Sequence, residues 1–233
     1  IVSILQRSLE KGKIAHAYLL SGPRGTGKTS VARILAHEIN GLPYSDETSH
    51  IDIIEIDAAS NNGVDDIRNL RDKSRVAPVS AKYKIYIIDE VHMLSRSAFN
   101  ALLKTLEEPP AHIVFIMATT DADKLPATIL SRVQQFHFHP ITSSIIAKHL
   151  IHIAKSEGFK LDKSAAELIA ERGNGGFRDS ISILDQLSSL VDQNNTLTSE
   201  IVISSLGLAD SSQIDSLVSA YQQGDVTSIV GLL

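Results

Sequence analysis

The sequence contains no cysteine, which excludes disulfide bonds and zinc sites built on cysteine thiolates. It also lacks an apolar run long enough to cross a bilayer, and we expect neither a secretory leader nor a membrane partner. The default expectation is therefore a cytoplasmic protein. Basic residues are not in excess, because 22 Lys and Arg stand against 27 Asp and Glu. This balance argues against a globally basic nucleic-acid binder but leaves a local basic surface open.

The length of 233 residues suits one large domain or two small ones. The chain starts at Ile1 inside a helix-like pattern and stops in another near Ile229 and Val230. We therefore expect an excised piece of a longer protein.

One octet carries most of the chemical information. Residues 22–29 fit the G-x-x-x-x-G-K-[ST] phosphate loop without a mismatch, between an apolar run at 17–20 and a helical pattern at 30–39. Glycines let successive backbone N–H groups point at phosphate oxygens, and the helix start adds further donors. Lys28 is expected at the β- and γ-phosphates and Thr29 at Mg²⁺. The expected ATP contacts are Gly22, Pro23, Arg24, Gly25, Thr26, Gly27, Lys28, Thr29 and Ser30.

Short apolar segments alternate with helical patterns up to Pro140. The expected strands are residues 17–20, 51–56, 84–88, 113–118 and 133–138, and a helix capped by Ser95 is expected over 95–106. This alternation predicts an α/β fold with a parallel five-stranded sheet and the phosphate loop at its carboxyl edge. After Pro140 the pattern predicts helices only. We expect domains over residues 1–140 and 141–208, with a weaker boundary before 209–233.

The apolar segment at 85–88 ends in Asp89 and Glu90. Asp89 can hold Mg²⁺ through a water molecule, and Glu90 can orient or deprotonate an attacking water. Alone, this pattern is more often a solvated strand end. Together with the phosphate loop it indicates ATP hydrolysis at the γ-phosphate. His92, two residues later, is interpreted as a packing or hydrogen-bonding residue.

Three more residues have both a catalytic and an ordinary interpretation. Thr120 follows an expected strand, where its hydroxyl can position water or simply cap the strand end. Arg132 can act on a neighbouring subunit's γ-phosphate as a finger, or be a surface arginine. Arg178 can report nucleotide state, or pair with Asp179 at a helix start.

Contact with DNA has the weakest support in the sequence. Arg68, Arg71 and Arg75 share one helix face, and Arg96 starts another helix. Such faces can follow a duplex backbone, but neighbouring aspartates make a solvated face the better interpretation.

The order of these pieces resembles the AAA+ ATPases, and within them the gamma/tau subunits of bacterial DNA polymerase III clamp loaders. The resemblance is carried by residues 15–19, 54–64, 87–95 and 99–110, and it weakens after about Asn194. It implies an ATPase core up to Pro140, a helical lid, and the start of an oligomerising collar. It also implies that Thr120 is the first sensor, Arg132 the finger acting in trans, and Arg178 the second sensor. The implied partners are other clamp-loader subunits in a hetero-oligomer, expected to be a pentamer, with the sliding clamp and primed DNA.

The sequence departs from that family in three places. Family members carry zinc-binding cysteines where residues 41–50 contain none, so we expect ATP and Mg²⁺ but no zinc. Val133 replaces the cysteine that follows the finger arginine, a conservative change. The segment that helps to hold adenine in the family would lie upstream of Ile1, and its absence predicts poor nucleotide affinity for this piece.

Two other functions stay open. One is a different AAA+ motor that acts on DNA, such as a branch-migration ATPase. The other is a scaffold subunit of a clamp loader that does not hydrolyse ATP, although the intact phosphate loop argues against it.

Overall fold

The computed structural model describes residues 1–45, 50–190, 196–207 and 218–224. The chain divides into two compact units, Ile1–Pro140 and Ile141–Leu233. The boundaries at 140 and 141 coincide with the sequence interpretation, whereas the expected boundary near 209 lies outside the described residues. Each unit is described by itself below.

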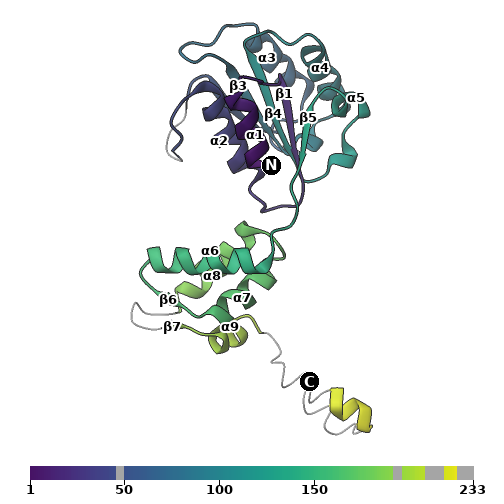
Figure 1. Ribbon diagram of the computed structural model, residues 1–233. Helices are drawn as coiled ribbons and strands as arrows, with labels where there is room; N and C mark the ends of the chain where they lie inside the picture. The colour runs from purple at the N-terminus through teal and green to yellow at the C-terminus, as the bar shows by residue number, and fades with distance from the viewer. Residues whose placement is uncertain (46–49, 191–195, 208–217, 225–233) are drawn as a thin grey trace. The chain divides into compact units, whose positions relative to one another are not determined.

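The first unit is built on one parallel sheet (Figure 1). Its five strands lie in the order β2-β3-β4-β1-β5. Their bounds are β1 Ala17–Ser21, β2 Ile53–Asp57, β3 Lys84–Asp89, β4 Ile113–Thr119 and β5 Gln134–His137. Each expected strand is present, and the parallel pairing of all neighbouring strands confirms the predicted sheet.

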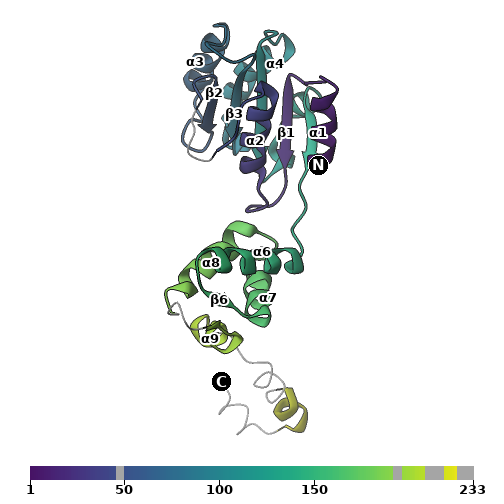
Figure 2. The same cartoon turned by 60° about the vertical axis from the view of Figure 1, so that its left-hand side comes forward.

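Successive side chains of the central strands point to opposite faces of the sheet, and each face is covered by its own apolar core. This explains why these strands are apolar at almost every position. In β1, Leu19 packs on one face of the sheet with α3 Val64–Ser74, α4 Arg96–Glu107 and α5 Ala127–Leu130. Tyr18 packs on the other face with α1 Val2–Glu10 and α2 Lys28–Asn40. The two helical layers are visible in Figures 1 and 2. The unit also contains two short 3-10 turns, η1 Val91–Met93 and η2 Ala122–Lys124.

Local capping places α4 as the sequence predicts. Ser95 is its N-cap residue, and the Ser95 hydroxyl accepts a hydrogen bond from Ala98 N at 3.2 Å. Phe99, Leu102 and Leu106 then lie on the buried face of the helix against the sheet. Strand β3, which precedes this helix in the chain, ends at Asp89, so Asp89 and the following Glu90 lie at the carboxyl edge of the sheet.

The second unit is a small helical domain with its own apolar core. It consists of α6 Ser143–Ser156, α7 Lys163–Arg172, α8 Phe177–Ser188 and α9 Ser199–Ser205. Ile146, Leu150, Ile169 and Leu184 are buried together at its centre.

The expectation of helices alone after Pro140 is wrong in one detail. Two short strands, β6 Lys160–Leu161 and β7 Thr196–Leu197, pair in parallel beside the helices. Strands of two residues are too short to show the alternation by which strands are recognised in a sequence. The pair ties the segment after α6 to the segment before α9 through backbone hydrogen bonds.

No described helix is both long and apolar enough to span a membrane.

Candidate active site

The phosphate-loop motif connects β1 to α2 at the carboxyl edge of the sheet. Gly25 and Gly27 have left-handed φ angles of 75° and 89°, which glycine adopts without strain. Helix α2 begins inside the motif, at Lys28, so the first N–H groups of the helix have no partner within it. Thr26 is buried and donates to Pro23 O at 2.8 Å, while Pro23, Arg24 and Ser30 are exposed. The loop is thus tied to itself and offers backbone donors of the kind that bind phosphate.

Lys28 holds its ammonium group at the mouth of this loop. Its Nζ donates to Gly22 O and Pro23 O, each at 2.8 Å, and the residue is only 6% exposed. An ammonium group has three donors, so one remains for a ligand. Burial lowers the pKa of Lys28 from its usual value, and the nearby charges of Glu90 and Asp89 act in the opposite direction.

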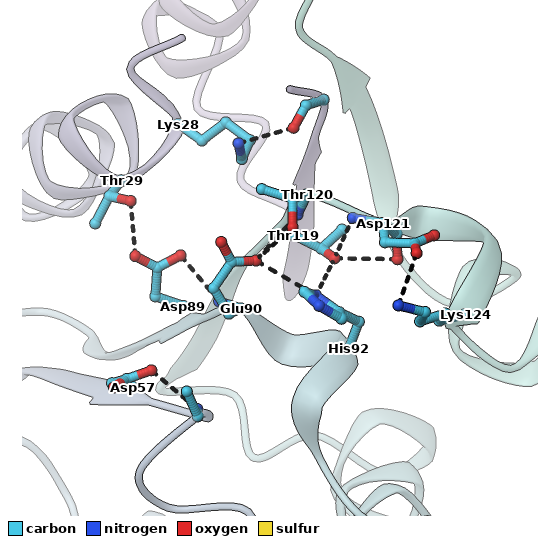
Figure 3. Close-up of polar contacts among 12 residues, drawn as sticks. Lys28, Thr29, Asp57, Asp89, Glu90, His92, Thr119, Thr120, Asp121 and Lys124 are labelled. Carbon is cyan, nitrogen blue, oxygen red and sulfur yellow. Dashed lines mark hydrogen bonds and ion pairs between the residues drawn. The ribbon is translucent and has the colours of Figure 1, made fainter. Parts of the chain in front are cut away.

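Thr29 and Asp89 meet across the gap between α2 and the end of β3 (Figure 3). Thr29 Oγ1 donates to Asp89 Oδ2 at 2.7 Å. A hydroxyl and a carboxylate oxygen are hard ligands of the type that Mg²⁺ prefers, and these two are close enough to contact one ion. In the part of the chain that the structure describes, no three or more His, Asp or Glu side chains are grouped to hold a metal. A magnesium ion at this site would therefore need further oxygens from water and phosphate.

Glu90 follows directly in an unusual backbone conformation. Its φ of 47° and ψ of 44° are left-handed, which costs a non-glycine residue on the order of 1–2 kcal/mol. The Glu90 Oε2 atom accepts hydrogen bonds from Thr120 N at 3.1 Å and from Thr120 Oγ1 at 3.0 Å. Because β3 and β4 are neighbours, the end of β4 brings Thr120 directly beside Glu90 (Figure 3).

His92 is the residue whose place at this site sequence reasoning missed. Its Nδ1 lies 2.9 Å from Thr119 Oγ1 and 3.3 Å from Glu90 Oε2, and the side chain is 10% exposed. The sequence predicts only packing or an unspecified hydrogen bond for it. The turn η1, which folds the chain back immediately after Glu90, is what brings His92 to that carboxylate, and no periodic pattern in the sequence indicates such a turn.

Arg132 lies at the amino ends of the strands, whereas the phosphate loop lies at their carboxyl ends. Strand β5 starts at Gln134, paired with Tyr18, and runs to His137, paired with Ser21 just before the phosphate loop. Arg132 precedes this strand, so about 10 Å of strand separates its backbone from the loop. The guanidinium donates to Glu107 Oε1 and to Thr128 O, both at 2.8 Å. These contacts direct Arg132 away from the phosphate loop of its own chain.

Arg178 belongs to the second unit, where it is an exposed residue in the first turn of α8. Within the described residues it forms no ion pair with Asp179, so the ordinary interpretation of that arginine has no contact to support it.

The arginines considered for DNA contact are partly neutralised by their neighbours. On α3, Arg68 pairs with Asp65 at 3.1 Å, and Arg71 pairs with Asp72 at 3.4 Å. Both aspartates are more than half exposed, so these are solvated surface pairs. This arrangement agrees with a solvated face.

Comparison with known proteins identifies the family. Residues 1–142 match the family model described as DNA polymerase III, delta subunit, and residues 145–190 match the ATPase lid domain of DNA polymerase III clamp loader subunits. The chain is 50% identical over 203 residues to DNA polymerase III subunit tau of Bacillus subtilis, covering 81% of this chain and 36% of the relative. It is 41% identical over 247 residues to subunit tau of Escherichia coli, covering 100% of this chain and 38% of the relative. The chain thus spans little more than a third of the length of these curated relatives.

Solved structures share the fold. The RuvB Holliday junction branch migration motor of Thermotoga maritima aligns with a TM-score of 0.71 at 20% identity, over 94% of this chain and 73% of that chain. A DNA polymerase III gamma subunit-related protein from the same organism aligns with a TM-score of 0.59 at 20% identity, over 99% of this chain and 75% of that chain. At this identity the likeness concerns architecture alone, and it agrees with an AAA+ core. The sequence relatives, by contrast, separate the chain from branch-migration motors: it belongs to the clamp-loader subunits of bacterial DNA polymerase III.

Proposed function

We propose that this chain binds Mg·ATP at its phosphate loop and hydrolyses it, as a motor subunit of the loader that places the sliding clamp on primed DNA. The observation that carries the proposal is the convergence of Lys28, Thr29, Asp89 and Glu90 at one edge of the sheet. These four side chains supply a cation, two metal-ligating oxygens and a base. A scaffold subunit that does not hydrolyse ATP has no use for this combination.

Each group has a distinct role in binding. The backbone donors of residues 22–30 surround the phosphates, and the free donor of Lys28 neutralises the β- and γ-phosphates. Thr29 would hold Mg²⁺ directly, and Asp89 would hold it through water. The bound ion would draw negative charge from the phosphate oxygens. No cysteine is available for the zinc module found in the family, and the proposed reaction does not need zinc.

Hydrolysis then needs one water and one base. The water oxygen forms a bond to the γ-phosphorus, and the bond from that phosphorus to the bridging oxygen breaks, with its electron pair leaving on ADP. One water proton passes to the Glu90 carboxylate and from there to solvent or product phosphate. Thr120, which donates to Glu90, keeps that carboxylate at the phosphate end of the site. Arg178 of the lid is proposed as the second sensor of the bound phosphates.

The finger is proposed to act between subunits. The ion pair of Arg132 with Glu107 and its position at the opposite sheet edge favour a target outside its own chain. In a hetero-oligomer of clamp-loader subunits, Arg132 would reach the γ-phosphate held by a neighbour, where a finger accelerates hydrolysis by about 10³–10⁵-fold. Contacts with primed DNA are proposed to be with the duplex backbone and independent of base sequence.

The test is ATP turnover by the full-length protein in its assembled complex, with and without clamp and primed DNA. We expect turnover that the clamp and DNA stimulate, and we expect Lys28→Ala to abolish Mg·ATP binding. The matched control is Lys11→Ala, which removes an exposed lysine after α1. If the full-length protein does not bind Mg·ATP, the scaffold function is correct. If Lys28→Ala binds ATP normally, the nucleotide site lies elsewhere.

A further inference from the structure

The two oxygens of the Glu90 carboxylate are not equivalent. Oε2 accepts from Thr120 N at 3.1 Å and from Thr120 Oγ1 at 3.0 Å, and it lies 3.3 Å from His92 Nδ1. Among the described residues, no hydrogen bond ends on Oε1. One oxygen is therefore anchored by protein donors, and the other is available to accept a proton (Figure 3).

The polar contacts around Thr119 favour one placement of hydrogen on the His92 ring. The Thr119 hydroxyl has a single hydrogen, and it is donated to Asp121 O at 3.1 Å. The same oxygen accepts from Asp121 N at 3.0 Å. Asp121 O and Glu90 Oε2 can only accept, so the arrangement that satisfies every contact here has His92 Nδ1 donating to Thr119 Oγ1, at 2.9 Å. In that arrangement the Nδ1 N–H is donated to Thr119 Oγ1 and lies beside Glu90 Oε2, which is 3.3 Å from the same nitrogen.

The position of His92 is also well defined. Its side chain is 10% exposed, and it stands on η1, the turn that follows Glu90 without a break. Thr119, its other partner, is the last residue of β4 and is fully buried. A donor held by a buried hydroxyl on a central strand can fix a neighbouring carboxylate more firmly than a solvated side chain can.

We propose that His92 is a positioning residue for hydrolysis: with Thr120 it anchors Glu90 Oε2, so that Oε1 is the atom that takes the proton from the attacking water. This inference rests on the proposed ATPase function. It explains why the left-handed backbone of Glu90 is tolerated, since two hydrogen bonds from Thr120 and the neighbouring His92 ring hold its side chain in one direction. His92 itself does not touch the nucleotide in this arrangement, and its effect reaches the reaction through Glu90.

The experiment compares two substitutions of equal polarity. Asn attaches its amide nitrogen to Cγ, as His attaches Nδ1, so His92→Asn keeps a donor at the required place. Gln extends the amide one carbon further, to the place of Nε2, so His92→Gln loses that donor. Each full-length variant is assembled with its partner subunits, clamp and primed DNA. The dissociation constant for Mg·ATP, kcat and KM are then measured, with the thermal unfolding midpoint as a folding control.

We expect His92→Gln to lower kcat by about tenfold or more while the dissociation constant for Mg·ATP stays within about twofold. His92→Asn should retain kcat within about threefold. Wild-type kcat in both variants, equal losses in both, or a parallel loss of ATP binding would overturn the positioning role. A wild-type complex that neither binds nor hydrolyses ATP would instead refute the proposed function, so the two failures are distinguishable.

Discussion

Thr29 and Asp89 are 60 residues apart in the sequence, yet the hydroxyl of one donates to the carboxylate of the other at 2.7 Å. The contact joins the first turn of α2 to the last residue of β3. It therefore ties the phosphate loop to the end of the strand that precedes the proposed base, Glu90. The register of the sheet sets this distance, because β3 and β1 both pair with β4 between them.

Removing the Thr29 hydroxyl should weaken metal-dependent binding specifically. Thr29→Val keeps the shape of the side chain but loses the oxygen, and we expect the affinity for Mg·ATP to fall by about ten- to hundredfold, the equivalent of one charge-assisted contact. Thr29→Ser keeps the hydroxyl and should remain within a few-fold of wild type. Titration with a fluorescent ATP analogue at several magnesium concentrations measures the effect. Equal affinity of the Val and Ser variants would contradict a metal contact by Thr29.

Arg132→Ala should separate binding from turnover. The residue lies far from the phosphate loop of its own chain, so nucleotide affinity should not change. In the assembled complex we expect turnover to fall by about hundredfold or more. An isolated subunit, which has no neighbour to serve, should show the same low rate with or without Arg132. A loss of equal size in the isolated subunit would argue for action within one chain.

Gly22 should not tolerate a side chain. A Cβ there would lie 2.2 Å from Phe138 O, and the φ of 138° is one that other residues rarely adopt. We expect Gly22→Ala to reduce the free energy of unfolding by about 2–4 kcal/mol. Gly41→Ala is the matched control. Gly41 has a φ of 64°, but a Cβ added there would meet no atom within 4 Å. This variant should therefore lose only about 1 kcal/mol of unfolding free energy, through conformational strain. Urea denaturation of both variants measures the difference.

Asp52 should make the stability of the first unit depend on pH in the acidic range, with stability lost as the pH falls. Burial would raise its pKa, but N–H groups of Ser80, Ala81 and Val79 donate to the carboxylate and lower the pKa to about 2. The folded pKa lies below the unfolded value, so the stabilisation is fully present above about pH 4 and is lost as pH falls through about 2.

Asp52→Asn tests this dependence. At neutral pH we expect the substitution to lower the free energy of unfolding by on the order of 1–2 kcal/mol. This value is discounted for solvent screening, because the carboxylate lies under a surface segment. The gap between wild type and variant should shrink as pH falls from 4 towards 2. Asp65→Asn, on the exposed side of α3, serves as control and should not reproduce this convergence. A gap that stays constant down to pH 2 would show that the charge of Asp52 contributes nothing.

Sequence reasoning is most successful where a local pattern has one physical cause. The phosphate loop, the apolar strands and the Ser95 cap each combine signals within a dozen residues, and the fold follows from them. The contacts that refine the site are of another kind. Glu90 meets Thr120 across 30 positions, and Arg132 meets Glu107 across 25.

Such pairs depend on the register between neighbouring strands and on the turns at their ends, neither of which a single sequence encodes as a repeat. The contacts of His92 escape prediction for this reason. The sequence places it near Glu90, but only the folded turn brings its Nδ1 to both Thr119 Oγ1 and Glu90 Oε2.

Arg132 and the phosphate loop lie at opposite ends of the strands of one sheet. Each subunit therefore has two different faces, one with the arginine and one with the nucleotide site. If Arg132 acts on the nucleotide of a neighbour, the arginine face of one subunit must contact the nucleotide face of the next, so the subunits associate head to tail. An arc that does not close then has two unequal ends. The subunit at one end binds a nucleotide that no arginine reaches, and the subunit at the other end has an arginine with no neighbouring nucleotide. The number of complete hydrolytic centres is therefore one fewer than the number of such subunits in the row.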